Sequence, residues 1–184
     1  MTRSRRGGFT LVELMVVVAI IGVLVVMSYS LLSGQPRALD VAEQISAKIS
    51  EASRKAVAGG AVRANVAQNV GITARTRVIL ELGSPTVVST ERLVENQPAT
   101  STSASWVEFN RIALPRAIRV VGWREAPTLS STAGAEFTTD PTIYCEPDGR
   151  CTGRIIYLQS ADGRTKARVV VLPLGGTPIT FDGW

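Results

Sequence analysis

The segment RRGGFTLVELMVVVAIIGVLVVMSYSLL occupies residues 5–32 and joins a short basic stretch to a long apolar run. Between Leu14 and Met27 every residue is nonpolar. A helix over residues 9–32 has about 24 residues, enough to cross a hydrocarbon core about 30 Å thick. The arginines that precede this helix favour a cytoplasmic N-terminus.

A general secretory signal peptide has the same order of basic and then apolar residues. Two features argue against that interpretation. No A-x-A-like cleavage site follows the apolar run, and the double glycine Gly7-Gly8 lies before it. Cleavage after Gly8 would therefore leave the apolar helix on the mature protein.

Glu13 is a carboxylate inside the predicted membrane segment, where a charge costs a few kcal/mol, about 3 on insertion scales. Cleavage after Gly8 would create an ammonium group at Phe9, four residues earlier and on the same helical face. Between neighbouring helices of a filament, these two charges can neutralise each other and set the axial register. In the alternative interpretation, Glu13 only reaches the lipid head groups at the end of the span.

Residues 5–32 resemble the class III signal of type IV pilins and type II secretion pseudopilins. The shared features are a basic leader, a glycine, a phenylalanine, a glutamate five residues after the glycine and an aliphatic helix. The resemblance implies cleavage between Gly8 and Phe9 by prepilin peptidase, and N-methylation of Phe9. It also implies storage in the bacterial inner membrane with the head in the periplasm. Assembly with other pilin subunits on an inner-membrane platform would follow, giving a periplasmic pseudopilus or an extracellular pilus.

After Pro36 the chain becomes amphipathic, which predicts the second half of a long helix. Apolar residues recur there at spacings of three and four, which places them on one helical stripe. The stripe consists of Val41, Ile45, Ile49, Ala52 and Ala56. Gly59-Gly60 predicts the end of the helix. Pilins often carry a proline about 22 residues into the mature chain, a position that Ser30 occupies here. The expectation is one helix from about residue 10 to 58.

From about residue 73 the pattern changes to short alternating runs between turn residues, which predicts an antiparallel sheet or two small sheets. Five runs are clear, and five to seven strands are expected in total. The clear runs cover residues 75–82, 106–112, 117–123, 153–159 and 166–172. Asp162-Gly163 predicts a hairpin between the last two. Loops are expected over residues 96–105 and 126–142.

The predicted fold class is therefore α+β, with a long N-terminal helix packed on a β-rich head, as in the pilin fold. The expected boundaries are a leader at 1–8, a transmembrane or filament-core helix at 9–32, an amphipathic helix at 33–58 and a head at 59–184.

Cys145 and Cys151 flank the turn-forming sequence EPDGR. Opposite cysteines across a short hairpin can reach disulfide distance. Because the membrane topology places this region in an oxidising compartment, a disulfide is expected. Two free thiols are the alternative.

The C-terminal third, from Ile143 to Gly176, resembles the closing strands of the H-type minor pseudopilins and their minor pilin counterparts. In that family an apolar-x-Pro-x-Gly turn, a long strand, a Gly-Arg turn and a last strand before a glycine follow one another. The chain departs from this pattern at the inserted cysteine pair and at Gly176, where an arginine is usual. The resemblance implies a low-copy subunit near the filament tip that helps to prime assembly. A major pilin is the alternative.

Composition argues against an enzyme. The 184 residues include no histidine and two cysteines, which excludes histidine-based triads and most zinc sites. The sequence contains no phosphate-binding glycine loop and no EF-hand spacing. We expect no catalytic residues, no metal and no cofactor.

The basic residues Arg164, Lys166 and Arg168 form a candidate nucleic-acid-binding site, because strand alternation places the last two on one face. Such a site would favour a DNA-binding minor pilin of a competence system. Tyr157 is the aromatic residue best placed to stack on bases. The favoured alternative is a solvated strand face that pairs with acidic neighbours in the filament. The net charge of +5 adds little to the DNA hypothesis, because the leader supplies three of the five charges.

Overall fold

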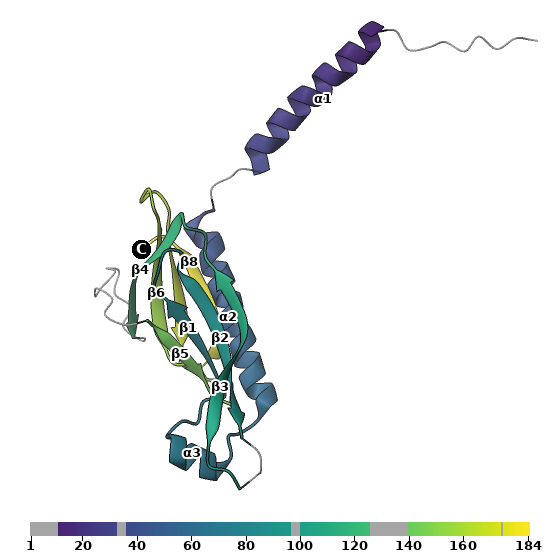
Figure 1. The fold of residues 1–184 in the computed structure, drawn as a ribbon. Helices are drawn as coiled ribbons and strands as arrows, with labels where there is room; N and C mark the ends of the chain where they lie inside the picture. Colours follow the sequence, from purple (N-terminus) through teal and green to yellow (C-terminus); the bar gives the residue numbers. More distant parts are fainter. Residues whose placement is uncertain (1–10, 33–35, 97–99, 126–139, 174) are drawn as a thin grey trace, which may run out of the picture. The chain divides into compact units, whose positions relative to one another are not determined.

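The computed structural model describes residues 11–32, 36–96, 100–125, 140–173 and 175–184 of the chain, in two compact units that divide between residues 35 and 36. The first unit contains the helix α1 (Leu11–Leu32). The second unit, which we call the head, contains two helices and eight strands within the described residues (Figure 1). These are α2 (Ala38–Gly59), α3 (Ala64–Val70), β1 (Thr76–Glu81), β2 (Val87–Glu95), β3 (Ala104–Ala113), β4 (Ile118–Glu125), β5 (Thr142–Cys145), β6 (Arg154–Ser160), β7 (Lys166–Leu172) and β8 (Gly175–Asp182).

The expectation of one continuous helix from residue 10 to 58 was wrong. Pro36 and Arg37 are not helical, and Arg37 has extended backbone angles of φ −81° and ψ 151°. Proline lacks an N–H group and disfavours helical geometry in the residue before it. At Arg37 the main-chain N–H donates a hydrogen bond of 3.1 Å to the Asp40 carboxylate, which satisfies a donor at the start of α2.

α2 ends where the double glycine predicts. The helix stops at Gly59, and Gly60 has a φ of +66°, a backbone angle that residues with a Cβ atom rarely adopt. The Gly60 N–H donates to the carbonyl of Val57, which closes the last turn. The guanidinium group of Arg75 then donates to the carbonyls of Gly59, Gly60 and Ala61 at 3.1–3.2 Å.

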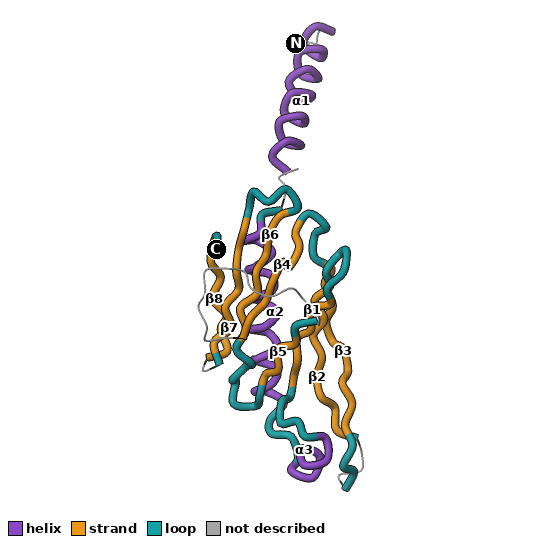
Figure 2. The backbone as a smooth tube through the Cα atoms, turned by 90° about the vertical axis from the view of Figure 1, so that its left-hand side faces the viewer, coloured by secondary structure: helices purple, strands orange, loops and turns teal. Residues whose placement is uncertain are grey.

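The eight strands form two antiparallel sheets of four strands each. One sheet has the order β3-β2-β1-β5, which we call sheet A, and the other has the order β4-β6-β7-β8, which we call sheet B. Figure 2 shows β3 and β8 at the outer edges of the head, with α2 running between them. The predicted hairpin at Asp162-Gly163 is confirmed, since it joins β6 to β7 and Gly163 has a φ of +73°.

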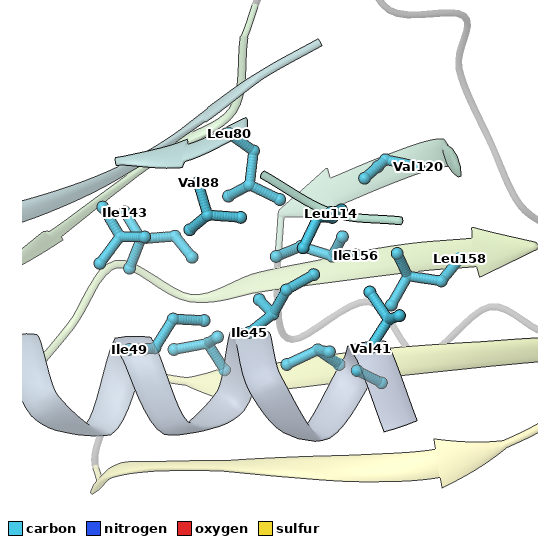
Figure 3. Close-up of a cluster of buried hydrophobic side chains, with 14 of the residues drawn as sticks. Val41, Ile45, Ile49, Leu80, Val88, Leu114, Val120, Ile143, Ile156 and Leu158 are labelled. Atoms are coloured by element: carbon cyan, nitrogen blue, oxygen red, sulfur yellow. The ribbon is translucent and has the colours of Figure 1, made fainter. Parts of the chain in front are cut away.

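The core lies between α2 and the inner faces of both sheets. All five residues of the predicted stripe are fully buried, which confirms the helical periodicity. Figure 3 shows Val41, Ile45 and Ile49 of α2 pointing toward residues of both sheets. Those residues are Leu80, Val88 and Ile143 of sheet A and Val120, Ile156 and Leu158 of sheet B. Burial of one such side chain stabilises the head by about 1.5–3 kcal/mol.

All five clear strand predictions correspond to observed strands, but the expected total was too low. The three strands that the sequence did not reveal are β2, β5 and β8. The apolar alternation of β2 is broken by Ser89 and Thr90, which are nevertheless buried. β8 begins Gly-Gly-Thr-Pro, which is typical of a turn, and it is an edge strand, where proline is tolerated.

The two predicted loops lie only partly within the described residues. Residues 97–99 and 126–139 are outside them. Of the remaining loop positions, Ala104 and Ser105 belong to β3, and Thr142 begins β5.

Candidate functional site

α1 is the one helix, among the residues that the structure describes, that is long and apolar enough to cross a membrane. Its 22 residues correspond to about 33 Å of helix, close to the thickness of a hydrocarbon core. In the single chain, residues 11–28 are exposed, so this surface is left for lipid or for other helices to cover.

Glu13 lies in the first turn of α1. Within Leu11–Leu32 it is the only charged residue. The helix macrodipole favours a negative charge in a first turn. Its predicted counterpart, the Phe9 amine, and the predicted cleavage site after Gly8 lie outside the described residues.

The Cys145–Cys151 disulfide is present, as predicted. The two cysteines also form an isolated antiparallel bridge, and both side chains lie in the hydrophobic core. Between them, residues 146–150 form a turn in which the N–H of Glu146 donates to the carbonyl of Arg150 at 2.7 Å. The disulfide therefore fixes a short loop to the hydrophobic core of the head.

The three predicted basic residues lie at one end of the β6–β7 hairpin. The Arg164 side chain is 85% exposed and pairs with Asp162 at 3.7 Å. A hydrogen bond from the Ser160 hydroxyl holds the pKa of Asp162 below its usual value, so this carboxylate stays charged beside Arg164. Lys166 and Arg168 alternate on β7 and share a face, as the strand pattern predicts.

Two aromatic rings that the sequence analysis missed lie against this basic face. Lys166 Nζ is 4.4 Å from the centroid of the Trp184 ring, and the Arg168 guanidinium is 4.8 Å from the centroid of the Phe181 ring. Each is within cation–π distance. The pairing of Arg168 with Phe181 across β7 and β8 was not predictable, because β8 itself was not predicted.

Tyr157, which the sequence analysis favoured for stacking on bases, is fully buried. Trp184 packs edge-on against it at 5.5 Å between ring centroids. Trp184 Nε1 also donates a hydrogen bond of 3.2 Å to the carbonyl of Leu158. Tyr157 is therefore a packing residue in this structure, and that prediction was wrong.

Acidic neighbours, some close in the sequence and one on another strand, reduce the positive charge of the stretch from 150 to 168. Arg154 pairs with Glu125 at 2.6 Å, and Arg150 pairs with Asp148 at 2.5 Å and with Glu146 at 3.3 Å. A hydrogen bond from the Arg150 main chain contributes most to lowering the pKa of Asp148. The stretch from 150 to 168 is thus less cationic in the fold than in the sequence.

No group of three or more His, Cys, Asp or Glu side chains is placed to hold a metal ion in the described parts of the chain. The main features relevant to function are therefore an apolar helix with one carboxylate, a disulfide-bonded head and the surfaces of that head. Together they define an α+β protein of the pilin fold class.

Residues 3–29 match the prokaryotic N-terminal methylation motif. The chain is also similar to the solved structure of the minor pseudopilin EpsH from the Type 2 Secretion System of Vibrio cholerae. The TM-score is 0.50 and the identity 11%, over 80% of this chain and 98% of that one. No curated protein sequence matches the chain. The N-terminal motif and the shared fold support the resemblance to type IV pilins and pseudopilins.

Proposed function

We propose that this chain is a minor, low-abundance subunit of a type II secretion pseudopilus or a type IV pilus. The observation that carries the proposal is the combination of a prepilin-type N-terminus with a head that shares the fold of a minor pseudopilin. The subunit helps to initiate assembly or forms part of the tip. Its role is structural and not enzymatic.

In this proposal, prepilin peptidase cleaves between Gly8 and Phe9, and Phe9 becomes N-methylated. Before assembly, residues 9–32 anchor the subunit in the inner membrane with the N-terminus in the cytoplasm. Residues 33–58, which form the amphipathic helix, and the β-rich residues 59–184 face the periplasm. The inner-membrane assembly platform then transfers the subunit into a filament of related subunits.

The exposed apolar surface of α1 supplies most of the association energy, since burial contributes about 25 cal/mol for each Å². This term is not directional and does not select one axial position. A charge pair between Glu13 of one subunit and the Phe9 amine of its neighbour does select one, because both charges are costly to leave unpaired in an apolar filament core.

Filament composition tests this proposal. We expect an epitope-tagged subunit in sheared or purified filaments at a few per cent or less of the main subunit, and fewer filaments when its gene is deleted. A subunit that makes up most of the filament mass would instead be a major pilin. Absence from the filaments, with the protein processed and stable, would contradict the proposal.

A DNA-binding minor pilin is the second candidate, supported by the cations of β7 that lie over Trp184 and Phe181. Gel shifts with residues 36–184 test it, since phosphate contacts make binding salt-sensitive. Replacement of Arg164, Lys166 and Arg168 by Ala should then abolish the shift, whereas Arg54→Ala with Arg92→Ala should not. Absence of a salt-sensitive shift would remove this candidate.

A further inference from the structure

Sheet A extends beyond the helix that covers it. α2 packs on β1 and β2, whereas β3 is the edge strand on the far side of β2. None of the ten residues of β3 is fully buried. Figure 2 shows β3 at the outer edge of the head. The inward-facing side of β3 therefore remains partly open.

A groove of about 320 Å³ lies between the C-terminal turns of α2 and this open part of sheet A. We call it the α2–β3 groove, and it is lined by Lys55, Ala58, Gly59, Arg92, Val107 and Phe109. Val107 is 48% exposed, which is unusual for a valine on the inner face of a sheet. A second hollow of about 240 Å³ shares Gly59 and Arg92 with it and extends it toward Glu95.

The groove combines an apolar floor with two cations. Lys55 Nζ lies 3.7 Å from the centroid of the Phe109 ring, and Arg92 is exposed beside Val107. Arg54 adds a further exposed cation on the last turns of α2.

Two carboxylates beside the groove, Glu51 and Glu95, are engaged by groups of the head. Glu51 accepts hydrogen bonds from Lys48 and Asn110 as well as pairing with Lys55. At the other end, Glu95 pairs with Arg63 and Arg75. A ligand that complements the groove must therefore bring its own negative charge together with apolar groups.

We propose that the α2–β3 groove receives the acidic start of the extramembrane helix of a neighbouring subunit of the same filament. This inference rests on the proposed function, because it requires a filament neighbour. It adds which surface of the head is used, the chemistry of the partner segment and the axial position of the partner.

The charge distribution along α2 indicates the axial offset. Asp40 and Glu43 are exposed on its first turns, and Arg54 and Lys55 are exposed near its end. Subunits inserted in one membrane have parallel helices. A neighbour with an acidic start like that of α2 would place like charges together at zero offset. The acidic and basic ends of α2 are 11–15 residues apart, about 20 Å.

A neighbour displaced by about 20 Å along α2, in the direction from its first turn to its last, has the acidic start of its helix at the level of Lys55 and Arg92. The partner is therefore the neighbour that is displaced in this direction. Opposite charges in this arrangement favour the correct register and disfavour the unshifted one.

Site-specific photocrosslinking in cells that assemble filaments tests the proposal. The full chain carries p-benzoylphenylalanine in place of Val107 in the groove. A matched control carries it in place of Ile179 on β8, which is 44% exposed. We expect the photocrosslinker at position 107 to form a crosslink to a peptide from the first extramembrane helical turns of a subunit with a prepilin motif. That peptide should contain Asp or Glu. Position 179 should not join this peptide.

Charge reversal tests the electrostatic part. With Lys55→Glu and Arg92→Glu, the adduct at position 107 should fall about tenfold or more, since like charges then face each other. Lys55→Arg with Arg92→Lys keeps the charges and should retain the adduct. Thermal unfolding of each variant shows that the head remains folded. Val107→Glu, with the photocrosslinker moved to Phe109, is a second reversal variant if the first is unstable.

The outcomes separate this inference from the proposed function. If the processed subunit is present in filaments, three results overturn the groove assignment and leave the subunit role standing. They are the absence of an adduct at position 107, an adduct to lipid or to a peptide that contains no acidic residue, and an adduct that charge reversal does not affect. Absence of the processed subunit from filaments overturns both.

Discussion

The hydroxyl of Ser53 on α2 donates a hydrogen bond of 3.0 Å to the main-chain carbonyl of Gly149, 96 residues later in the chain. Gly149 belongs to the turn that the Cys145–Cys151 disulfide closes. The disulfide therefore does more than close a small loop, because it holds an acceptor against the helix that organises the core. A side chain on Gly149 would contact Val57 at 3.4 Å, and the glycine has a φ of +87°.

Removal of the disulfide should destabilise the head measurably. For Cys145→Ala with Cys151→Ala, we expect the free energy of unfolding to fall by about 2–3 kcal/mol, from lost loop constraint and lost core packing. Urea unfolding followed by tryptophan fluorescence measures this change. Ser53→Ala alone should cost about 1 kcal/mol, as expected for one hydrogen bond. A urea midpoint unchanged in the double variant would contradict the role assigned to the disulfide.

Glu95 holds together the end of the head at which α2 terminates. Its carboxylate pairs with Arg63 and with Arg75, whose guanidinium group also caps α2. For Glu95→Gln, we expect a loss of about 2 kcal/mol of unfolding free energy, typical of charged hydrogen bonds at a largely buried site. Glu81→Gln is the matched control, because the Glu81–Arg111 pair is much more exposed and should contribute less than about 1 kcal/mol. Equal effects of the two substitutions would contradict this ranking.

The contribution of Glu95 should depend on pH. Burial by itself would raise the pKa of Glu95, but hydrogen bonds from Arg63 and Arg75 outweigh burial and leave this pKa below its usual value. A lowered folded-state pKa stabilises the head above the unfolded-state pKa of about 4.3, and that stabilisation is lost as the pH falls through the folded-state pKa. The difference in unfolding free energy between the native chain and Glu95→Gln should be complete at about pH 7 and shrink below about pH 4. A difference that stays constant from about pH 7 to pH 3 would exclude this linkage.

The sequence predicted α1, α2 and five of the strands because their apolar periodicity is local, whereas the short helix α3 was missed. The stripe from Val41 to Ala56 needs no knowledge of its partner strands to be recognised. β2 could not be recognised in the same way, since the fold buries Ser89 and Thr90 in the middle of it. The break in the helix at Pro36 was also missed, because the pattern of an apolar helix followed by an amphipathic one is also that of a single continuous helix.

The candidate site was predictable to the extent that it depends on residues close in the sequence. Glu13 and the cysteine pair belong to this group. The environment of Arg154 and Arg168 was not predictable, because it depends on Glu125 and Phe181, which the sheet brings across from other strands. A charge count along the chain therefore overestimated the basic patch.

Maturation should depend on the residue before the predicted cleavage site. For Gly8→Leu, we expect the precursor to persist, since a bulky side chain replaces the small residue at the scissile bond. The readout is the electrophoretic band, which should stay at the precursor position instead of shifting to the processed form. Ser4→Leu, within the leader but away from the bond, should be processed normally. Normal processing of Gly8→Leu would place the cleavage elsewhere.

Recruitment into filaments should depend on the charge of Glu13. For Glu13→Ala, we expect cleavage and a folded head but at least a tenfold loss of the subunit from filaments, because the Phe9 amine of a neighbour would lose its partner in an apolar environment. Immunoblots of purified filaments and of the membrane fraction measure this ratio. Val12→Ala changes the adjacent apolar position of the same helix and should leave recruitment nearly unchanged. If Glu13→Ala enters filaments as efficiently as Val12→Ala, the apolar surface of α1 is sufficient, and the charge pair does not set the register.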